Sequence, residues 1–223
     1  MTIGFGSVPY IPDFFHQPAI DAIAVFVVSA LLAIMINAEA QAFMAAALGD
    51  SRPDAKDRFH FNVFLHLDIL GSICYLVAGF GWPKPIDIDP DKFKYPRLYT
   101  VLVRLAGPLA NILLANITAS LVFAASFMNI DPVVFLMVLG VNVTTAIYNL
   151  IPLPPLAAYS LFSIWLPSES QGIKKILQVS GPFIIVAIFL IERITGVGII
   201  SPYLNPLVRE IVRLIAGLPT QAS

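Results

Sequence analysis

The chain contains long segments without a charged residue, and these segments restrict its possible folds more than any other feature. Residues 105–130 carry no Asp, Glu, Lys or Arg over 26 positions, and residues 132–168 carry none over 37. About 20 mostly apolar residues are enough for a helix to cross the hydrocarbon layer of a membrane. Only 12% of the residues are charged, against about 25% in an ordinary soluble domain. The sequence therefore predicts an all-α polytopic membrane protein.

Charge and cysteine content exclude two other classes of protein. The 13 Lys and Arg residues are balanced by 14 Asp and Glu, which leaves a net charge of −1. No basic patch is large enough to neutralise many phosphates, so we expect no nucleic-acid partner. The single cysteine, Cys74, cannot form an intramolecular disulfide and is interpreted as a small buried hydrophobic residue.

The apolar segments predict about four to six membrane segments within one membrane domain, residues 19–200. Pro152, Pro154 and Pro155 break the longest uncharged run, because proline lacks the amide donor that a helix needs. The helices predicted from these segments are 19–48, 105–130, 133–151, 156–166 and 176–191. A short N-terminal segment, residues 1–18, precedes this domain.

The tail, residues 201–223, is predicted to contain an amphipathic helix over 202–218. Its charged and apolar residues alternate with helical spacing, so they fall on opposite sides. The charged side carries Arg209, Glu210 and Arg213, and the apolar side carries Leu207, Ile211 and Leu214. This pattern is typical of a helix that lies in the membrane interface.

Residues 66–81 are apolar but short for a span, and they contain Asp68. If this segment crosses the membrane, the basic residues of 49–65 and 83–104 lie on opposite faces. If it re-enters without crossing, they share one face, as the positive-inside rule favours. We therefore expect a short re-entrant segment, with a β-hairpin as the alternative and the N-terminus outside.

Seven polar residues stand out inside the predicted membrane segments, where unpaired polar groups are costly. They are Asn37, Glu39, Gln41, Asp68, Asn111, Asn142 and Asn149. Asn37 and Gln41 are four residues apart and share a helix face, whereas Glu39 lies roughly 160° away. Hydrogen bonds between helices are one interpretation of these residues. A functional site is the other.

Five short motifs occur in order between residues 37 and 158. They are Asn37-Ala38-Glu39-Ala40-Gln41 with Gly49-Asp50; Asn62 to Gly71, with His66 and Asp68 inside; Gly81-Trp82-Pro83-Lys84-Pro85-Ile86; Ala106-Gly107-Pro108-Leu109-Ala110-Asn111; and Asn142 with Asn149-Leu150-Ile151-Pro152-Leu153-Pro154-Pro155-Leu156 before Ala157-Ala158. Each motif is weak alone, but five in this order and spacing are specific.

These motifs resemble those of the site-2 protease family of intramembrane zinc metalloproteases, in its compact bacterial branch. The resemblance covers about residues 20–165 and implies a site-2 protease-like helical core there. In the family the first motif reads H-E-x-x-H and the last ends in P-P-L-D-G. Such a resemblance supports the fold more strongly than the function.

The resemblance also implies where a zinc site would lie, and the chain lacks its residues. In the family two histidines and an aspartate bind zinc, and the glutamate after the first histidine is the general base. Asn37 and Gln41 replace the histidines, Ala38 replaces the base, and Ala157 replaces the aspartate. Neutral amides are poor zinc ligands and an alanine side chain is none. We therefore expect no bound metal, no other cofactor and no catalytic residues.

Other chemical sites have less support in the sequence. His60, His66 and Asp68 could meet at a metal, but hydrogen-bonded loop histidines explain them better, and His16 is expected on the opposite side. Ser160 and Ser163 have no His or Lys partner nearby in the sequence.

Residues 59–63 alternate apolar and polar side chains, which indicates a half-buried strand or, equally, a plain loop. In the family such a strand edge accepts an unwound transmembrane substrate. Strand addition uses backbone hydrogen bonds and needs no zinc. Glu39, Asn62, His66, Asp68 and the three asparagines of the later helices are therefore candidate partner-binding or structural residues.

Three functions follow from these observations. The first is a catalytically inactive homologue, acting as a structural or accessory subunit of a membrane hetero-complex. The second is a regulatory pseudoprotease that binds transmembrane clients, and the third is a metalloprotease with a non-standard site at Glu39. A transporter is weaker, because no repeated half is visible. The expected partners are integral membrane proteins and lipids, and the expected location is the bacterial inner membrane.

Overall fold

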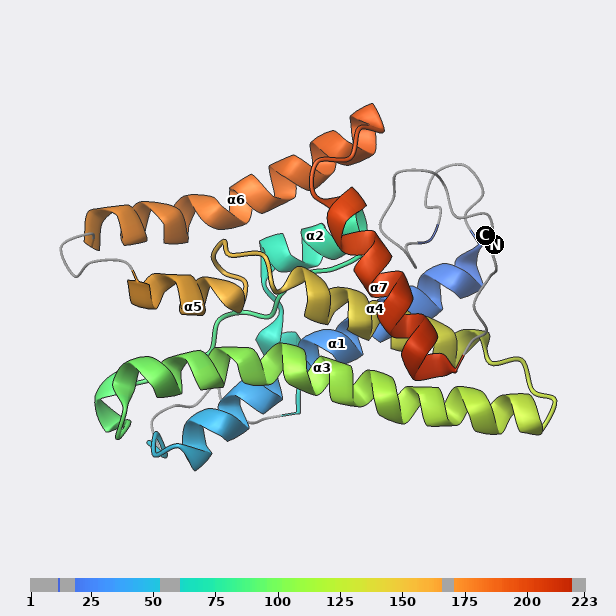
Figure 1. Ribbon diagram of the computed structural model, residues 1–223, viewed down its shortest axis with the longest axis horizontal. Coiled ribbons are helices and arrows are strands. Elements are labelled where there is room, and N and C mark those ends of the chain that lie inside the picture. The colour runs from blue at the N-terminus through green and yellow to red at the C-terminus, as the bar shows by residue number, and fades with distance from the viewer. Residues whose placement is uncertain (1–11, 13–18, 53–60, 166–170, 218–223) are drawn as a thin grey trace.

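The computed structural model describes residue 12 and residues 19–52, 61–165 and 171–217. The elements in chain order are α1 (Ile20–Ala47), η1 (Val63–His66), α2 (Ile69–Ala78), η2 (Pro90–Lys92), α3 (Pro96–Phe127), α4 (Val133–Tyr148), α5 (Ala158–Trp165), α6 (Gln171–Thr195) and α7 (Ser201–Ala216). Over these residues the β structure is one isolated bridge, which confirms the all-α prediction. Figure 1 shows α3 and α6 along opposite edges of the molecule, with α2 and α4 between them.

Three of the described helices, α1, α3 and α6, are long and apolar enough to cross a membrane. They lie where the uncharged runs predicted them, and the chain is a membrane protein. Helix α3 begins at Pro96, earlier than predicted, and α6 extends from Gln171 to Thr195. The difference arises because charged residues such as Arg97 and Lys174 belong to the helical ends, beyond the apolar segment. Proline is favoured in the first turn, where its missing N–H costs nothing.

Helix α4 is shorter, with 16 residues, and lies at the centre of the molecule. Every residue from Met137 to Tyr148 is buried. Helix α4 packs against α1, α3 and α7. A helix that is apolar all round belongs inside a protein core, which explains its position. The helix ends at Tyr148, because the proline-rich loop follows, and α5 then begins close to the predicted position.

The two ends of the segment that contains α2 lie next to each other. Leu67 pairs with Pro83 in the isolated antiparallel bridge, and Lys84 N donates a hydrogen bond to His66 O at 2.7 Å. Gly79 ends α2 with a φ of 74°, a left-handed conformation that favours glycine. The two ends of the segment therefore lie side by side, an arrangement that a re-entrant segment requires. The β-hairpin alternative was wrong, because its interior is helical.

The main core contains residues of α2, α3, α4, α6 and α7. Three aromatic rings lie at its centre, with ring centroids of Phe80 and Tyr148 4.5 Å apart and those of Phe80 and Phe189 5.1 Å apart. Tyr148 Oη also donates a hydrogen bond to Asn205 Oδ1 at 2.7 Å, which joins α4 to α7. This core holds the loop before α5 in place.

Helix α7 confirms the predicted tail helix but presents a different face to the protein. It packs against α3 and α4, with Val208 and Val212 buried. Leu207 and Leu214, which were predicted on the apolar side, are exposed, as are Arg209 and Glu210, whereas Arg213 is half-buried. The helical spacing identified the helix, but the tertiary contacts decide which apolar residues are buried.

Candidate functional site

Three of the four positions that the motifs align with metal ligands and base lie around one cavity. Asn37 and Gln41 reach it from α1, and Ala157 reaches it from the loop that precedes α5. The cavity measures about 300 Å³. Ala38 is fully buried but does not line it. The fold therefore keeps positions 37, 41 and 157 together, although they are 120 residues apart at the extremes.

The proline-rich loop positions Ala157 at the cavity. Asn149 ends α4, and its carbonyl accepts a hydrogen bond from Ala158 N at 3.0 Å across the loop. The Asn149 side chain donates to Thr145 O at 2.8 Å. Gly181 of α6 lies against this loop, since a Cβ added there would be 2.3 Å from Pro154 O. The loop is thus closed at its base and pressed against α6.

A chain of side-chain amides occupies the place where the resemblance implies zinc. Gln41 Nε2 donates to Asn37 Oδ1 at 2.8 Å, and Asn37 Nδ2 donates to Asn111 Oδ1 at 2.7 Å. Asn111 Nδ2 in turn donates to Asn142 Oδ1 at 2.9 Å and to Ala33 O at 3.0 Å. These bonds join α1, α3 and α4. The prediction of hydrogen bonds between helices is confirmed for these residues.

Gly107 makes room for this chain. A Cβ at position 107 would lie 2.3 Å from Asn37 Oδ1 and 2.6 Å from Asn37 Cγ, much closer than atoms can approach. Glycine therefore allows α3 to pack directly on the Asn37 side chain, as small residues do at helix interfaces in membranes. Gly107 and Asn111, both in the fourth motif, therefore lie at one interface, where α3 contacts Asn37 of α1.

Arg104 extends the amide chain on the cavity side. Its Nη1 donates to Gln41 Oε1 at 3.0 Å, and its Nη2 donates to Ile86 O at 3.3 Å. Arg104 is the only charged side chain among the described residues that line the cavity. In the sequence, Arg104 stands out only as one of the basic residues that precede a span. Its distance of three residues from Gly107, on the same helix face, was the available signal.

The side chains at the cavity do not fit a zinc ion. Zinc in proteins is bound by thiolate, imidazole or carboxylate groups. Here two amides and a methyl group take the ligand positions, and the Arg104 guanidinium, a fixed cation, lies beside them. Across the described residues, no group of three or more His, Cys, Asp or Glu side chains could hold a metal ion. The donor set therefore disagrees with the family's metal.

Glu39 lies apart from the cavity and contacts residues 61–66, which precede α2. It is buried, and its Oε1 lies 3.0 Å from His66 Nε2 and accepts from Phe61 N at 2.6 Å. Glu39 thus ties residues 61–66 to α1. Helical spacing predicted that Glu39 points away from Asn37 and Gln41, and its contacts agree with this prediction. Glu39 does not line the cavity.

The alternation at residues 59–63 does not form a strand over its described part. Phe61 has a positive φ of 48°, which a strand does not contain, and Asn62 caps η1 by accepting from Phe64 N at 3.1 Å. The strand alternative was wrong for Phe61 to Val63, because the bond from Phe61 N to Glu39 bends the backbone. Residues 59 and 60 lie outside the described residues.

Asp68 caps α2. Its Oδ1 accepts from Gly71 N at 2.7 Å and from Trp82 Nε1 at 3.0 Å. A cap of this type satisfies a backbone donor at the start of a helix. Asp68 therefore joins the start of α2 to the chain that returns from it. His16 and His60, the other histidines considered for a metal, lie outside the described residues.

The remaining nucleophile candidates have local partners. Ser160 Oγ donates to Ala157 O at 2.6 Å, and Ser163 Oγ donates to Ser160 O at 2.8 Å. Cys74 is buried in the main core, as interpreted from the sequence. None of the three is arranged as a nucleophile beside a base within the described residues.

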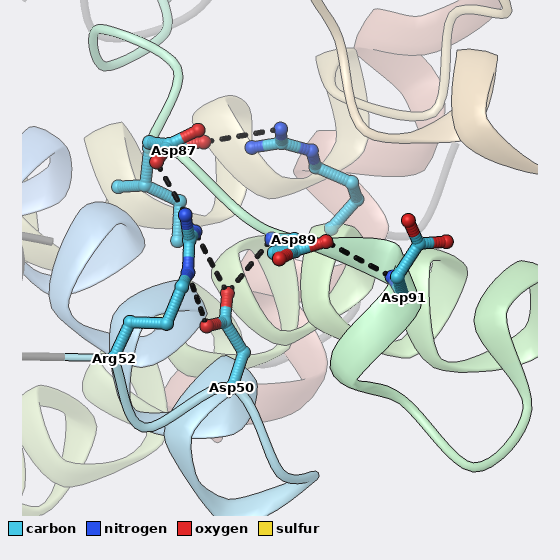
Figure 2. A network of polar contacts seen from close by, with 7 residues as sticks. Asp50, Arg52, Asp87, Asp89 and Asp91 are labelled. Carbon is cyan, nitrogen blue, oxygen red and sulfur yellow. Dashed lines mark hydrogen bonds and ion pairs between the residues drawn. The ribbon is translucent and has the colours of Figure 1, made fainter.

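Asp50 follows α1 and connects it to the loop before α3, as Figure 2 shows. Gly49 has a φ of 119°, and its position beside Lys92 O leaves little space for a side chain. The buried Asp50 carboxylate accepts from Arg52 Nε at 2.8 Å and from Asp89 N at 2.8 Å. The hydrogen bond to Asp50 raises the pKa of Arg52 further above its usual value, so Arg52 stays charged beside Asp50.

The comparison with curated proteins identifies a bacterial relative. The chain is 31% identical over 202 residues to a protein of Bacillus subtilis (strain 168) named "Putative zinc metalloprotease YwhC". The alignment covers 86% of this chain and 91% of the relative. The chain belongs to the site-2 protease-like family. No protein-family model matches the chain. No solved structure matches it either.

Membership in the family explains why the five motifs occur in order and why positions 37, 41 and 157 meet at one cavity. It does not explain Asn37, Gln41 and Ala157 at those positions, which differ from the ligands that the resemblance implies. The family's frame is therefore present around a different set of side chains.

Proposed function

We propose that this protein is a catalytically inactive member of the family, which acts as a structural or accessory subunit of a membrane hetero-complex. The observation that carries the proposal is the cavity where Asn37, Gln41 and Ala157 meet. Gln41 is bonded to Asn37, and Asn37 is bonded to Asn111, so these amides stabilise the helix packing. No carboxylate or imidazole of a described residue lines this cavity.

Peptide hydrolysis in this family needs a metal-bound water and a base to take its proton. A base must come within hydrogen-bond reach of that water. Ala38 supplies no proton acceptor, and the nearest carboxylate on α1, Glu39, is bonded to His66 away from the cavity. This arrangement argues against the non-standard protease. The regulatory pseudoprotease rested on a strand edge, and Phe61 to Val63 do not form one.

The direct test is the metal content of the purified protein. We expect less than stoichiometric zinc by mass spectrometry, and a melting temperature that a chelator leaves unchanged, because no side chain at positions 37, 41 or 157 suits zinc. One zinc per chain, lost together with stability when chelator is added, would contradict the proposal.

The subunit role requires a separate experiment. The tagged chain is extracted from its native membrane, which we propose is the bacterial inner membrane, with a mild detergent. We expect integral membrane proteins to co-purify in fixed proportion, and crosslinking to give the same neighbours each time. Exchange among many clients would favour the regulatory alternative, and a monomer without neighbours would contradict both.

A further inference from the structure

The cavity beside the amide chain has the features of a binding site of its own. Its volume of about 300 Å³ is at the lower end of ligand pockets. Apolar side chains and prolines form most of its wall: Trp82, Pro83, Pro85, Pro154, Pro155 and Leu156. Polar groups also reach it: besides Asn37 and Gln41 of α1 these are Arg104 of α3, Asn149 at the end of α4, Tyr159 and Ser160 of α5, and Gln178 of α6. Such a mixture, mostly apolar with few converging polar groups, is typical of a small-molecule site.

Arg104 gives this cavity a positive charge. A guanidinium carries five N–H donors, and the hydrogen bonds of Arg104 to described residues go to two neutral oxygens, Gln41 Oε1 and Ile86 O. The acidic residue that acts on it electrostatically is Asp87, whose carboxylate is bonded to Arg52 at 3.1 Å and does not line the cavity. Arg104 therefore has N–H donors and a positive charge that are available to an anion in the cavity.

The hydroxyl of Tyr159 also points to a ligand in the cavity, independently of Arg104. Its side chain lines the cavity and is 8% exposed, yet its hydroxyl has no hydrogen-bond partner among the described residues. A buried hydroxyl without a partner costs free energy, so native proteins rarely contain one without a reason. A ligand oxygen in the cavity would satisfy it.

We propose that this cavity binds the carboxylate of a small, mostly apolar ligand, with Arg104 as the cationic donor and the Tyr159 hydroxyl as a second donor. One guanidinium balances one negative charge, and its planar fork matches the two oxygens of a carboxylate. The apolar wall accommodates the rest of the ligand. Where the family would hold a metal cation, this chain holds a cation of its own and accepts an anion.

The ligand has two sources with the same chemistry, a fatty acid dissolved in the bilayer or a water-soluble carboxylate. The test therefore uses radiolabelled octanoate and benzoate as probes, with octan-1-ol as the uncharged control. The full chain is reconstituted in nanodiscs, and binding is measured by equilibrium dialysis against empty nanodiscs. We expect saturable binding of at least one carboxylate, at one per chain, and none of octan-1-ol. Octanoate alone indicates the bilayer source, and benzoate alone indicates the aqueous one.

Two variants connect the binding to the structure. Arg104→Gln removes the charge and should weaken carboxylate binding about tenfold or more. Arg97→Gln changes an exposed arginine seven residues earlier on the same helix and should have no effect. Tyr159→Phe removes the unpartnered hydroxyl and should weaken binding about threefold. It should not lower the melting temperature, so it remains a test if Arg104→Gln does not fold.

Three results would overturn the proposal. The first is that both carboxylates bind no better than octan-1-ol. The second is that a folded Arg104→Gln variant binds as tightly as the wild type, and the third is that Tyr159→Phe does. The experiment needs neither zinc nor a partner protein, so its outcome is separate from that of the proposed subunit role.

Discussion

At the scale of single residues, the buried amides differ by where their partners lie. Asn116 of α3 donates to Ile112 O within its own helix and is exposed. Asn111, five residues earlier, bonds to side chains of two other helices and to Ala33 O. Only the second kind couples helices, so the two should respond differently to the same substitution.

Replacing Asn111→Leu should lower the free energy of unfolding by about 1–3 kcal/mol, because Asn37 Nδ2, Asn142 Oδ1 and Ala33 O lose their partner. The measurement is unfolding of the purified protein in mixed micelles. The matched control is Asn116→Leu, which we expect to cause no loss. Equal effects of the two variants would show that the amide chain does not couple the helices.

Gly107→Ala should destabilise the protein by about 1–3 kcal/mol, because the new methyl group overlaps Asn37. The double variant Gly107→Ala with Asn37→Ala should recover part of this loss, since the side chain that clashes is gone. Gly172→Ala on α6 is the control, as nothing lies within 4 Å of its added Cβ. Thermal unfolding of the three variants and the wild type tests the contact, and no recovery in the double variant would contradict it.

The sequence predicted the positions of the site but not all of its residues. Motif spacing led to Asn37, Gln41 and Ala157 because each replaces a residue of known type in the family. Arg104 and Tyr159 were missed, since neither belongs to a motif and their meeting depends on how α3 and α5 pack. Spacing along one element predicts a shared face, whereas contacts between elements require the fold.

At the scale of elements, two charged residues at the end of α6 organise the ends of two other helices. Glu192 Oε1 accepts hydrogen bonds from Ile199 N, Ile200 N and Ser201 N, the last at 3.2 Å. Arg193 Nη1 donates to Leu76 O at 2.8 Å and to Val77 O at 2.9 Å. Glu192 thus satisfies backbone donors at the start of α7, and Arg193 satisfies backbone acceptors at the end of α2.

Glu192→Ala should loosen the start of α7, because three backbone N–H groups lose a charged acceptor. We expect amide hydrogen exchange of residues 199–201 to become at least about tenfold faster. Glu210→Ala, an exposed carboxylate on α7 bonded to Arg213, is the control and should not change exchange there. Unchanged protection in the Glu192 variant would refute the capping role.

Helix positions were easier to predict than helix ends. The uncharged runs located α1, α3 and α6, but they stop at the first charged residue, whereas a helix continues into the interface. The predicted span 176–191 ends just before Glu192 and Arg193, but both residues lie inside α6. Five alternating residues were too few to predict the backbone at Phe61, which a single tertiary hydrogen bond decides.

At the scale of the whole molecule, the frame of the family and the chemistry of its site are separable. The core around Phe80, Tyr148 and Phe189 supports the α2 segment and the loop before α5, and it meets the cavity wall at Trp82 and Leu156 but does not include Ala38 or Ala157. Asn37, Gln41 and Ala157 can therefore differ from the family while the helices stay in place. This separation leads to a prediction about restoring the missing residues.

The fourfold variant Asn37→His, Ala38→Glu, Gln41→His and Ala157→Asp should bind about one zinc per chain. The reason is that positions 37, 41 and 157 already line one cavity, on α1 and on a loop closed by the bond from Ala158 N to Asn149 O. Zinc is measured by mass spectrometry after dialysis. The double variant Asn37→His with Gln41→His is the control, and with only two ligands it should lose its zinc in the same dialysis. A folded fourfold variant that retains no more zinc than the control would mean that the three positions no longer hold the geometry that a metal needs.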